Sequence, residues 1–242
     1  MKLGLVSDVH SNQEALRAVL DELDRRGAEK IVCLGDIVGY GPEPDECVAL
    51  VRERVAWSLL GNHDAMAVGQ AMPEYINLHA RRAMEWTRRH LSPESAEYLR
   101  GLPFVKRGDG AVFVHSSPRS PADWSYVATL EDVVEISEFF SEPICFLAHT
   151  HRPMLALREG DGRFRILDAD RFALKEGERL VVNVGSVGQP RDNDPRATAA
   201  LFDTESRQVS FVRVPYDVGA VQKKMLERGL PEFLAMRLSR GC

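Results

Sequence analysis

Five of the seven histidines follow directly on short apolar runs that have the composition of buried β-strands. Acidic and amide side chains occupy equivalent positions after the same runs. In open α/β sheets, the polar side chains that build a site gather at the carboxyl ends of the strands. We therefore single out a set of nine residues: Asp8, His10, Asp36, Asn62, His63, Asp64, His115, His149 and His151.

Each motif has a simpler explanation when it is taken alone. Asp8 and His10 place two ligand-type side chains on the same side of an extended segment, but such residues also form local hydrogen bonds in turns. His115 alone would be interpreted as a core histidine with satisfied hydrogen bonds. The pair His149 and His151 is more specific, because two imidazoles at i and i+2 on one loop are typical of a metal site. Coincidence does not explain five such histidines in one chain.

The elements that must position these residues alternate between strands and helices in the first part of the chain. The expected elements are a strand at Lys2–Val6, a helix that begins with a capping box at Ser11, a strand at Ile31–Leu34, a helix at Pro44–Arg54 and a strand at Ala56–Leu60. This order predicts parallel strands joined by right-handed crossovers. After Pro103, short β-like runs predominate, which predicts two packed sheets with helices outside.

A helical insertion, at roughly residues 65–101, separates these two parts of a chain that we interpret as one domain over residues 1–242. It begins directly after Asn62 and His63 and ends shortly before the strand that leads to His115. We therefore expect part of it to overhang the site and to limit substrate size. Candidates for lining the entrance are Asn77, His79 and, from another loop, Tyr40. An exposed or capping histidine is the alternative interpretation of His79.

Composition excludes several classes of protein. The chain has 242 residues, of which 44% are hydrophobic and 28% are charged, so an intrinsically disordered chain is excluded. A net charge of −5 gives no reason to expect a generic nucleic-acid or anionic-membrane partner. No apolar run approaches the roughly 20 residues of a membrane span. The four cysteines show no CxxC pairing, which favours reduced thiols in a cytoplasmic protein.

The ordered set Asp-x-His, Gly-Asp, Gly-Asn-His-Asp, His and His-x-His resembles the calcineurin-like metallophosphoesterase superfamily. The runs at 35–42 and 183–191 resemble its small bacterial and archaeal phosphodiesterase-like branch. The resemblance implies a four-layer α/β/β/α sandwich, in which two mixed sheets are flanked by helices. It also implies a metal-dependent hydrolase of phosphate esters.

The resemblance further implies a centre of two divalent metal ions. Its ligand sets would be Asp8, His10 and His151 for one ion, Asn62, His115 and His149 for the other, and Asp36 as the bridge between both. A hydroxide that bridges the ions would be the nucleophile for in-line attack on phosphorus. Nitrogen and oxygen ligands suit Mn²⁺, which we favour, but also Fe, Zn²⁺, Co²⁺ and Ni²⁺.

The resemblance assigns His63 to the leaving group, which it would protonate or stabilise, and makes Asp64 the residue that orients it. Arg191, after the glycine-rich turn at 185–188, is a candidate phosphate contact. Where the superfamily usually has glycines, the chain has Ser116 and Ala148. The resemblance therefore does not define the space for substrate beside the metal site.

The expected substrate is a small phosphate ester, favoured as a diester, because Gly39 and Tyr40 stand where the protein phosphatases of the superfamily carry Asp-Arg. The alternatives are a phosphomonoesterase or protein phosphatase, a dinucleoside polyphosphate hydrolase, and a non-catalytic metal-binding scaffold of the same fold. The presence of His63 with a complete ligand set favours an enzyme over a scaffold. The oligomeric state is left open.

Overall fold

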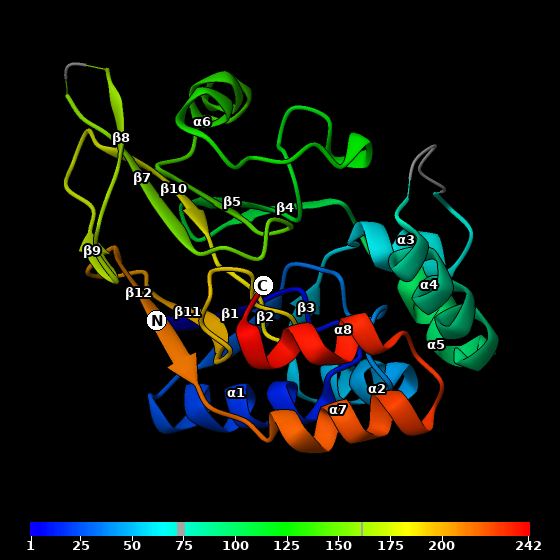
Figure 1. The fold of residues 1–242 in the computed structure, drawn as a ribbon. Helices are drawn as coiled ribbons and strands as arrows, with labels where there is room; N and C mark the ends of the chain where they lie inside the picture. The colour runs from blue at the N-terminus through cyan, green and yellow to red at the C-terminus, as the bar shows by residue number, and fades with distance from the viewer. Residues whose placement is uncertain (72–75, 161) are drawn as a thin grey trace.

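Two six-stranded mixed sheets face each other in this computed structural model, which describes residues 1–71, 76–160 and 162–242 (Figure 1). Sheet A has the strand order β3-β2-β1-β11-β12-β9, and sheet B has the order β4-β5-β6-β10-β7-β8. In sheet A, β1, β2 and β3 run parallel, and β11 joins β1 in the antiparallel direction. In sheet B, β5, β6 and β10 run parallel. Each sheet thus has three neighbouring parallel strands.

The strands are short and mostly buried. Sheet A consists of β1 (Lys2–Val6), β2 (Lys30–Cys33), β3 (Trp57–Ser58), β9 (Arg171–Ala173), β11 (Ala197–Asp203) and β12 (Gln208–Val214). Sheet B consists of β4 (Val105–Gly108), β5 (Ala111–Val114), β6 (Ile144–Leu147), β7 (Met154–Arg158), β8 (Phe164–Ile166) and β10 (Arg179–Asn183). The central parallel strands are apolar on both faces, as expected for strands covered by layers on each side.

Helices cover the outer faces of both sheets and complete the four layers. The α-helices are α1 (Gln13–Arg25), α2 (Pro44–Arg54), α3 (Asn62–Ala67), α4 (Leu78–His90), α5 (Pro93–Arg100), α6 (Leu130–Ile136), α7 (Val218–Glu227) and α8 (Glu232–Met236). Short 3₁₀ helices occupy Pro121–Asp123, Ser137–Phe139 and Arg237–Arg240. Figure 1 shows α1, α2 and α7 below sheet A and α6 above sheet B. This confirms the four-layer α/β/β/α sandwich.

One apolar core lies between the two sheets. The Phe113 and Phe146 rings of sheet B stack with their centroids 5.3 Å apart, and Phe146 also contacts Phe202 of sheet A. A second core joins sheet A to α1 and α2, and a third joins sheet B to α6. The burial of both faces holds the carboxyl ends of the parallel strands at one common edge.

Three local expectations need correction. Helix α1 is capped by Asn12, whose side chain accepts a hydrogen bond from the Ala15 backbone N–H, and not by Ser11. Ser11 has a φ of 55° in the tight turn that follows His10, so it cannot serve as the cap. The third strand is limited to Trp57–Ser58, and β9 was not expected, because it has only three residues, of which two are exposed.

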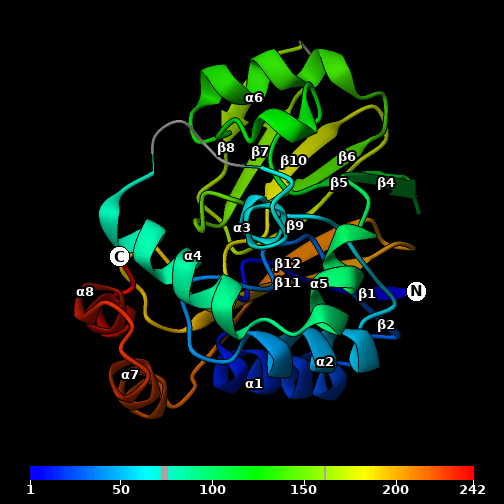
Figure 2. The ribbon, with the colours of Figure 1, turned by 90° about the vertical axis from the view of Figure 1, so that its right-hand side faces the viewer.

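The helical insertion is divided into three helices, α3, α4 and α5, which lie at one end of the sandwich (Figure 2). Helix α3 begins at Asn62, within the polar motif itself and three residues earlier than expected. Residues 72–75 of the insertion lie outside the described part of the chain. Among the described residues, no helix combines the length and apolar character needed to cross a membrane.

Candidate metal centre

The parallel strands of both sheets end at the same edge, where they bring the polar motifs together. The contributors are β1 with Asp8 and His10, β2 with Asp36, β3 with Asn62 and His63, β5 with His115, and β6 with His149 and His151. The side chains of Asp8, His10, Asp36, His115 and His151 are almost completely buried. The ligand set predicted from the sequence therefore forms one compact cluster.

The backbone of this cluster is strained. Left-handed φ values of 49–67° occur at five of its residues, Asp8, His10, Asp36, His149 and His151. Such values cost a non-glycine residue of the order of 1–3 kcal/mol and persist only where the surroundings enforce them. Here the turns after β1 and β2 enforce them mutually, because the backbone N–H of His10 donates to the carbonyl of Asp36 over 3.0 Å.

The first cluster consists of Asp8, His10 and His151. His10 Nδ1 donates to the Val38 carbonyl over 3.2 Å, and His151 Nδ1 donates to the Gln189 carbonyl over 2.6 Å. These two carbonyls place a ring proton on each Nδ1 and leave Nε2 as the candidate ligand atom, and the two Nε2 nitrogens lie 3.1 Å apart. Asp8 Oδ1 lies 3.2 Å from His151 Nε2. Two imidazole nitrogens and a carboxylate oxygen at these distances form a group that could hold a metal ion.

The second cluster consists of Asp36, His115 and His149, and Asn62 lines the adjacent cavity together with His149. His115 Nε2 lies 3.5 Å from Asp36 Oδ2, while its Nδ1 donates to the Leu34 carbonyl over 2.9 Å. His149 is turned the other way, because its Nε2 donates to the Trp124 carbonyl over 2.9 Å, and its Nδ1 is left for a metal. These backbone carbonyls select the tautomer of each ring, as is usual for metal-binding histidines.

Several buried atoms of the two clusters and of Asn62 have no hydrogen-bond partner among the described residues. They are Asp8 Oδ1, Asp36 Oδ2, Asn62 Oδ1 and His115 Nε2. A buried polar atom without a partner is costly, and such atoms are rare in folded proteins. All four belong to the residues predicted as ligands, so the residues present fit divalent metal ions.

The carboxylates of the centre stay ionised despite their burial. Burial alone would raise the pKa of Asp8 and Asp36, but the neighbouring histidines outweigh it and hold both pKa values well below the usual range. Burial would lower the pKa of His115, yet the Asp36 carboxylate raises it to about 9. These couplings show how strongly the cluster attracts positive charge.

His63 lies within reach of the cluster, although the resemblance gives it no ligand role. Its ring centroid is 4.8 Å from that of His10 and 4.4 Å from that of Tyr40, and its Nδ1 has no partner among the described residues. A possible ligand atom of His63 also lies near His10 and Asp36. Burial lowers the pKa of His63 well below its usual value, so the ring is neutral in this environment.

Asp64 does not orient His63, in contrast to the expectation. Its carboxylate accepts hydrogen bonds from the backbone N–H groups of Val38 over 3.0 Å and Gly61 over 3.2 Å. Burial, together with the nearby Asp36, raises the pKa of Asp64 to about 7. Asp64 therefore braces the loops after β2 and β3. The sequence shows only that it is adjacent to His63, and the turn of α3 directs the two side chains apart.

Gly39 sets the position of the His63 ring. It has a φ of 99°, and a Cβ added to it would lie 2.6 Å from His63 Nδ1. We expect Gly39→Ala to displace the ring and to lower turnover at least tenfold, while both metal clusters keep their ligands. The matched control is Gly27→Ala, since Gly27 also has a positive φ of 79° but has no atom within 4 Å of the added Cβ. Steady-state kinetics and metal analysis of both variants would test this, and equal turnover in the two would contradict it.

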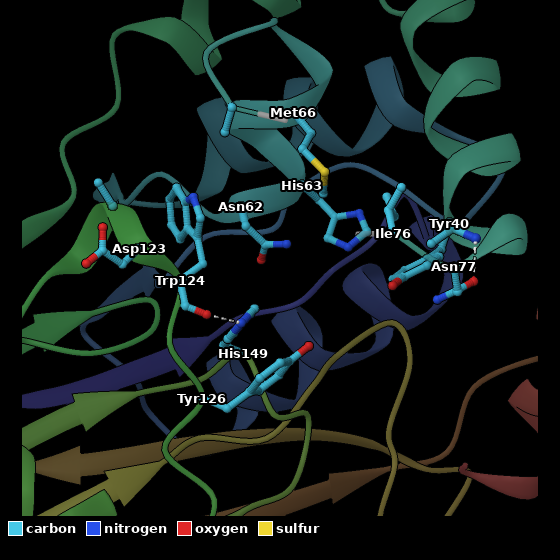
Figure 3. A pocket seen from close by; sticks show the side chains of 13 residues that line it. Tyr40, Asn62, His63, Met66, Ile76, Asn77, Asp123, Trp124, Tyr126 and His149 are labelled. Carbon is cyan, nitrogen blue, oxygen red and sulfur yellow. Dashed lines mark hydrogen bonds between the residues drawn. The ribbon is translucent and has the colours of Figure 1, made fainter. Parts of the chain in front are cut away.

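A cavity of about 580 Å³ opens beside the metal centre (Figure 3). It is lined by Tyr40, Asn62, His63, Met66, Ala71, Ile76, Asn77, Ala80, Ala122, Asp123, Trp124, Tyr126 and His149. The helical insertion thus supplies one wall of the cavity, as expected from its place in the chain. Tyr40 and Asn77 both line the cavity, as predicted, and Asn77 also caps α4.

Two of the predicted substrate contacts do not line this cavity. The ring of His79 stacks on Phe233 of α8 with centroids 4.8 Å apart, because the first turn of α4 directs it toward the C-terminal helices. This packing overturns the expectation for His79. Arg191 lies behind Tyr40, with its guanidinium carbon 5.9 Å from the centre of the Tyr40 ring.

Sequence reasoning missed the aromatic wall opposite the insertion. Trp124 supplies the carbonyl that orients His149, and the ring of Tyr126 stacks on the His149 ring with centroids 4.2 Å apart. Both residues come from the loop between β5 and α6. The only signal in the sequence is the presence of two aromatic residues in a segment without strand or helix periodicity.

The comparisons with known proteins agree with this geometry. The model of the calcineurin-like phosphoesterase superfamily domain matches residues 1–207. The chain is also 36% identical to an uncharacterized protein of Methanocaldococcus jannaschii, over 99% of this chain and 98% of the relative. The chain therefore belongs to the calcineurin-like phosphoesterase superfamily, a metal-dependent family, and is a hydrolase that acts on phosphate esters.

Two solved structures extend the similarity to the whole fold. A metallophosphoesterase from Sphaerobacter thermophilus is 40% identical, with a TM-score of 0.88 and coverage of 100% of this chain and 99% of the other. A hypothetical protein from Pyrococcus horikoshii is 25% identical, with a TM-score of 0.80 and coverage of 100% and 98%. The fold is thus shared over its whole length with a bacterial and an archaeal protein.

Proposed function

We propose that the protein is a phosphodiesterase, or a hydrolase of other small phosphate esters, that works with two divalent metal ions. The observation that carries this proposal is the shared position of Asp36. Its carboxylate lies 3.6 Å from His10 Nε2 on one side and 3.5 Å from His115 Nε2 on the other. A carboxylate between two ligand groups is what a pair of neighbouring ions requires.

When bound, the metal ions would supply an activated water as nucleophile and positive charge for the phosphate oxygens. In our proposal, Asp8, His10 and His151 hold one ion, and Asn62, His115 and His149 hold the other. His63 faces the cavity, where a ring N–H would support the departing oxygen. Mn²⁺ is our preferred metal among the ions that nitrogen and oxygen ligands without a thiolate can hold, which also include Fe, Zn²⁺, Co²⁺ and Ni²⁺.

The cavity supports a small substrate. Its volume of about 580 Å³ is within the range of pockets for small molecules, and the insertion and the Trp124 loop enclose it from two sides. We therefore favour small esters over folded phosphoproteins. We also keep the cytoplasm as the proposed location, since the thiols of Cys33, Cys47 and Cys145 are buried and unpaired.

Removal of the metals should abolish activity without unfolding the protein. We expect EDTA to eliminate the hydrolysis of bis(p-nitrophenyl) phosphate and Mn²⁺ to restore it. The core between the sheets does not depend on the centre, so the circular dichroism spectrum should remain native. The melting temperature should fall, because bound ions stabilise the folded state by mass action.

Metal content, measured by elemental analysis on the same samples, provides the control. Two ions per chain in the active protein would agree with the proposal. Full activity in protein that contains less than a tenth of an equivalent of metal would contradict it. A native spectrum with no hydrolysis of any mono- or diester at saturating Mn²⁺ would instead favour a metal-binding scaffold.

A further inference from the structure

Two arginines, Arg191 and Arg237, lie together behind Tyr40, which itself lines the cavity, and among the described residues neither is neutralised by an Asp or Glu side chain. Arg191 Nη2 donates to Gln189 Oε1 over 2.9 Å, and Arg237 Nη1 donates to the same oxygen over 3.2 Å. Arg237 Nε also donates to a main-chain oxygen of Cys242, the last residue of the sequence. Among the described residues, neither guanidinium forms an ion pair with an Asp or Glu, since the neighbouring Asp192 pairs with Arg213. The neutral amide oxygen of Gln189 thus accepts hydrogen bonds from both guanidinium groups.

This pair is connected directly to the metal centre. The backbone N–H of Arg191 donates to the His151 carbonyl over 3.2 Å, and the Gln189 carbonyl accepts from His151 Nδ1. The Arg191 guanidinium lies over the ring of Tyr40, which in turn contacts the rings of His10 and His63. Arg191 is therefore linked to the predicted metal ligands through the His151 backbone and the Tyr40 ring, and Arg237 is linked to Arg191 through Gln189.

The packing of the C-terminal helices brings Arg237 to this place. Tyr40, Ala80 of α4 and Leu234 and Leu238 of the C-terminal segment belong to one apolar cluster. Figure 2 shows α8 beside α4 at this end of the molecule. Arg237 follows α8 directly and also lies over the ring of Phe233. The site is thus built from segments far apart in the sequence.

Two adjacent guanidinium groups that share one neutral amide oxygen repel each other in a half-buried position, and Cys242 provides an oxygen to Arg237 alone. Burial and the charge of Arg191 lower the pKa of Arg237. The Nε atom of Arg191 is buried and has no partner among the described residues. An arginine with a purely structural role would normally receive a carboxylate in such a position. At the opposite end of the cavity, Asp123 would repel an anion, so the charge distribution favours the Tyr40 end.

We propose that Arg191 and Arg237 form a second anion subsite, which binds a phosphoryl group of the substrate other than the one held at the metal centre. This inference rests on the proposed function, because it assumes that the reacting phosphate lies at the metals. It specifies the substrate as a small molecule with at least two phosphoryl groups. Guanidinium groups suit this role because they donate several hydrogen bonds in a fixed plane to phosphate oxygens.

The test compares ligands with one and two phosphonate groups. Methylphosphonate and the diphosphonates with bridges of one to three carbons would be bound to the Mn²⁺-loaded protein, at fixed free Mn²⁺, by isothermal titration calorimetry. We expect at least one diphosphonate to bind about 10- to 100-fold more tightly than methylphosphonate, as two charge-assisted hydrogen bonds would provide. Arg237→Gln should remove most of this preference and leave methylphosphonate binding unchanged.

Arg240→Gln is the matched control, because Arg240 is exposed in the same 3₁₀ helix and its loss removes the same charge. It should keep the full preference, and Arg237→Lys should keep part of it, which guards against a folding defect in Arg237→Gln. An equal preference in both Gln variants, or none in the unaltered protein, would overturn the subsite. Calorimetry does not require turnover, so a failure of the proposed function would appear separately as absent Mn²⁺-dependent hydrolysis of bis(p-nitrophenyl) phosphate.

Discussion

Asp36→Asn should lower the metal affinity of both positions together and abolish activity. An Asn side chain can still accept the His63 backbone N–H, which donates to Asp36 Oδ1 over 2.8 Å. The amide NH₂ would then stand in place of Oδ2 and direct a donor toward His10 and His115. Loss of even an outer-shell partner typically costs 10- to 100-fold in metal affinity, so we expect at least about 100-fold at each position.

Asp8→Asn provides the matched comparison, since it makes the same chemical change in a residue of one cluster only. Asp8 groups with His10 and His151, whereas Asp36 groups with residues of both clusters. We expect one ion per chain in Asp8→Asn and none in Asp36→Asn under the same dialysis conditions, measured by elemental analysis. If Asp36→Asn lost a single ion and kept the other at full affinity, the bridging position would be wrong.

His63→Gln should retain both metals and lower turnover by roughly 10²- to 10⁴-fold, the usual contribution of a positioned acid, because the negative charge of a bound phosphate ester would favour protonation of the otherwise neutral ring. An alkoxide is a poor leaving group, and it departs only with a proton or a hydrogen bond at the oxygen. His63 lines the cavity, and its Nδ1 has no partner among the described residues, so the ring can meet a substrate there. The Gln side chain fills a similar space without the acid–base chemistry of the imidazole.

The leaving group separates the possible roles of His63. The loss of activity should be large for an alkyl phosphate ester and small for a p-nitrophenyl ester, because p-nitrophenolate departs without assistance. An equal loss for both esters would indicate that His63 orients the phosphate. Loss of metal would make His63 a ligand, a result that its proximity to His10 and Asp36 makes worth measuring. Elemental analysis of the same preparation answers this second question.

The candidate ligands and the scaffold that carries them could be predicted from the sequence. The alternation of buried strands with amphipathic helices can be predicted from the spacing of apolar residues. In α1, for example, Leu16, Val19 and Leu20 lie on one face of the helix and are buried. A polar residue directly after a buried strand must lie at the edge of the sheet, whatever the rest of the chain does. Asp8, Asp36 and His115 could therefore be identified without coordinates.

The hydrogen-bond partners and packing contacts of these residues depend on the tertiary structure. The carbonyl of Trp124 turns His149 in the opposite sense to the other histidines, and the backbone of Val38 and Gly61 engages Asp64 instead of His63. Arg237 reaches Gln189 through the packing of the C-terminal helices, 48 residues away in the chain. Periodicity reports which face of an element is buried, but it contains no information about the partner on the other side. Contacts between distant segments arise only when the two sheets close on one another, and for that reason they decide the tautomers, the walls of the cavity and its charge.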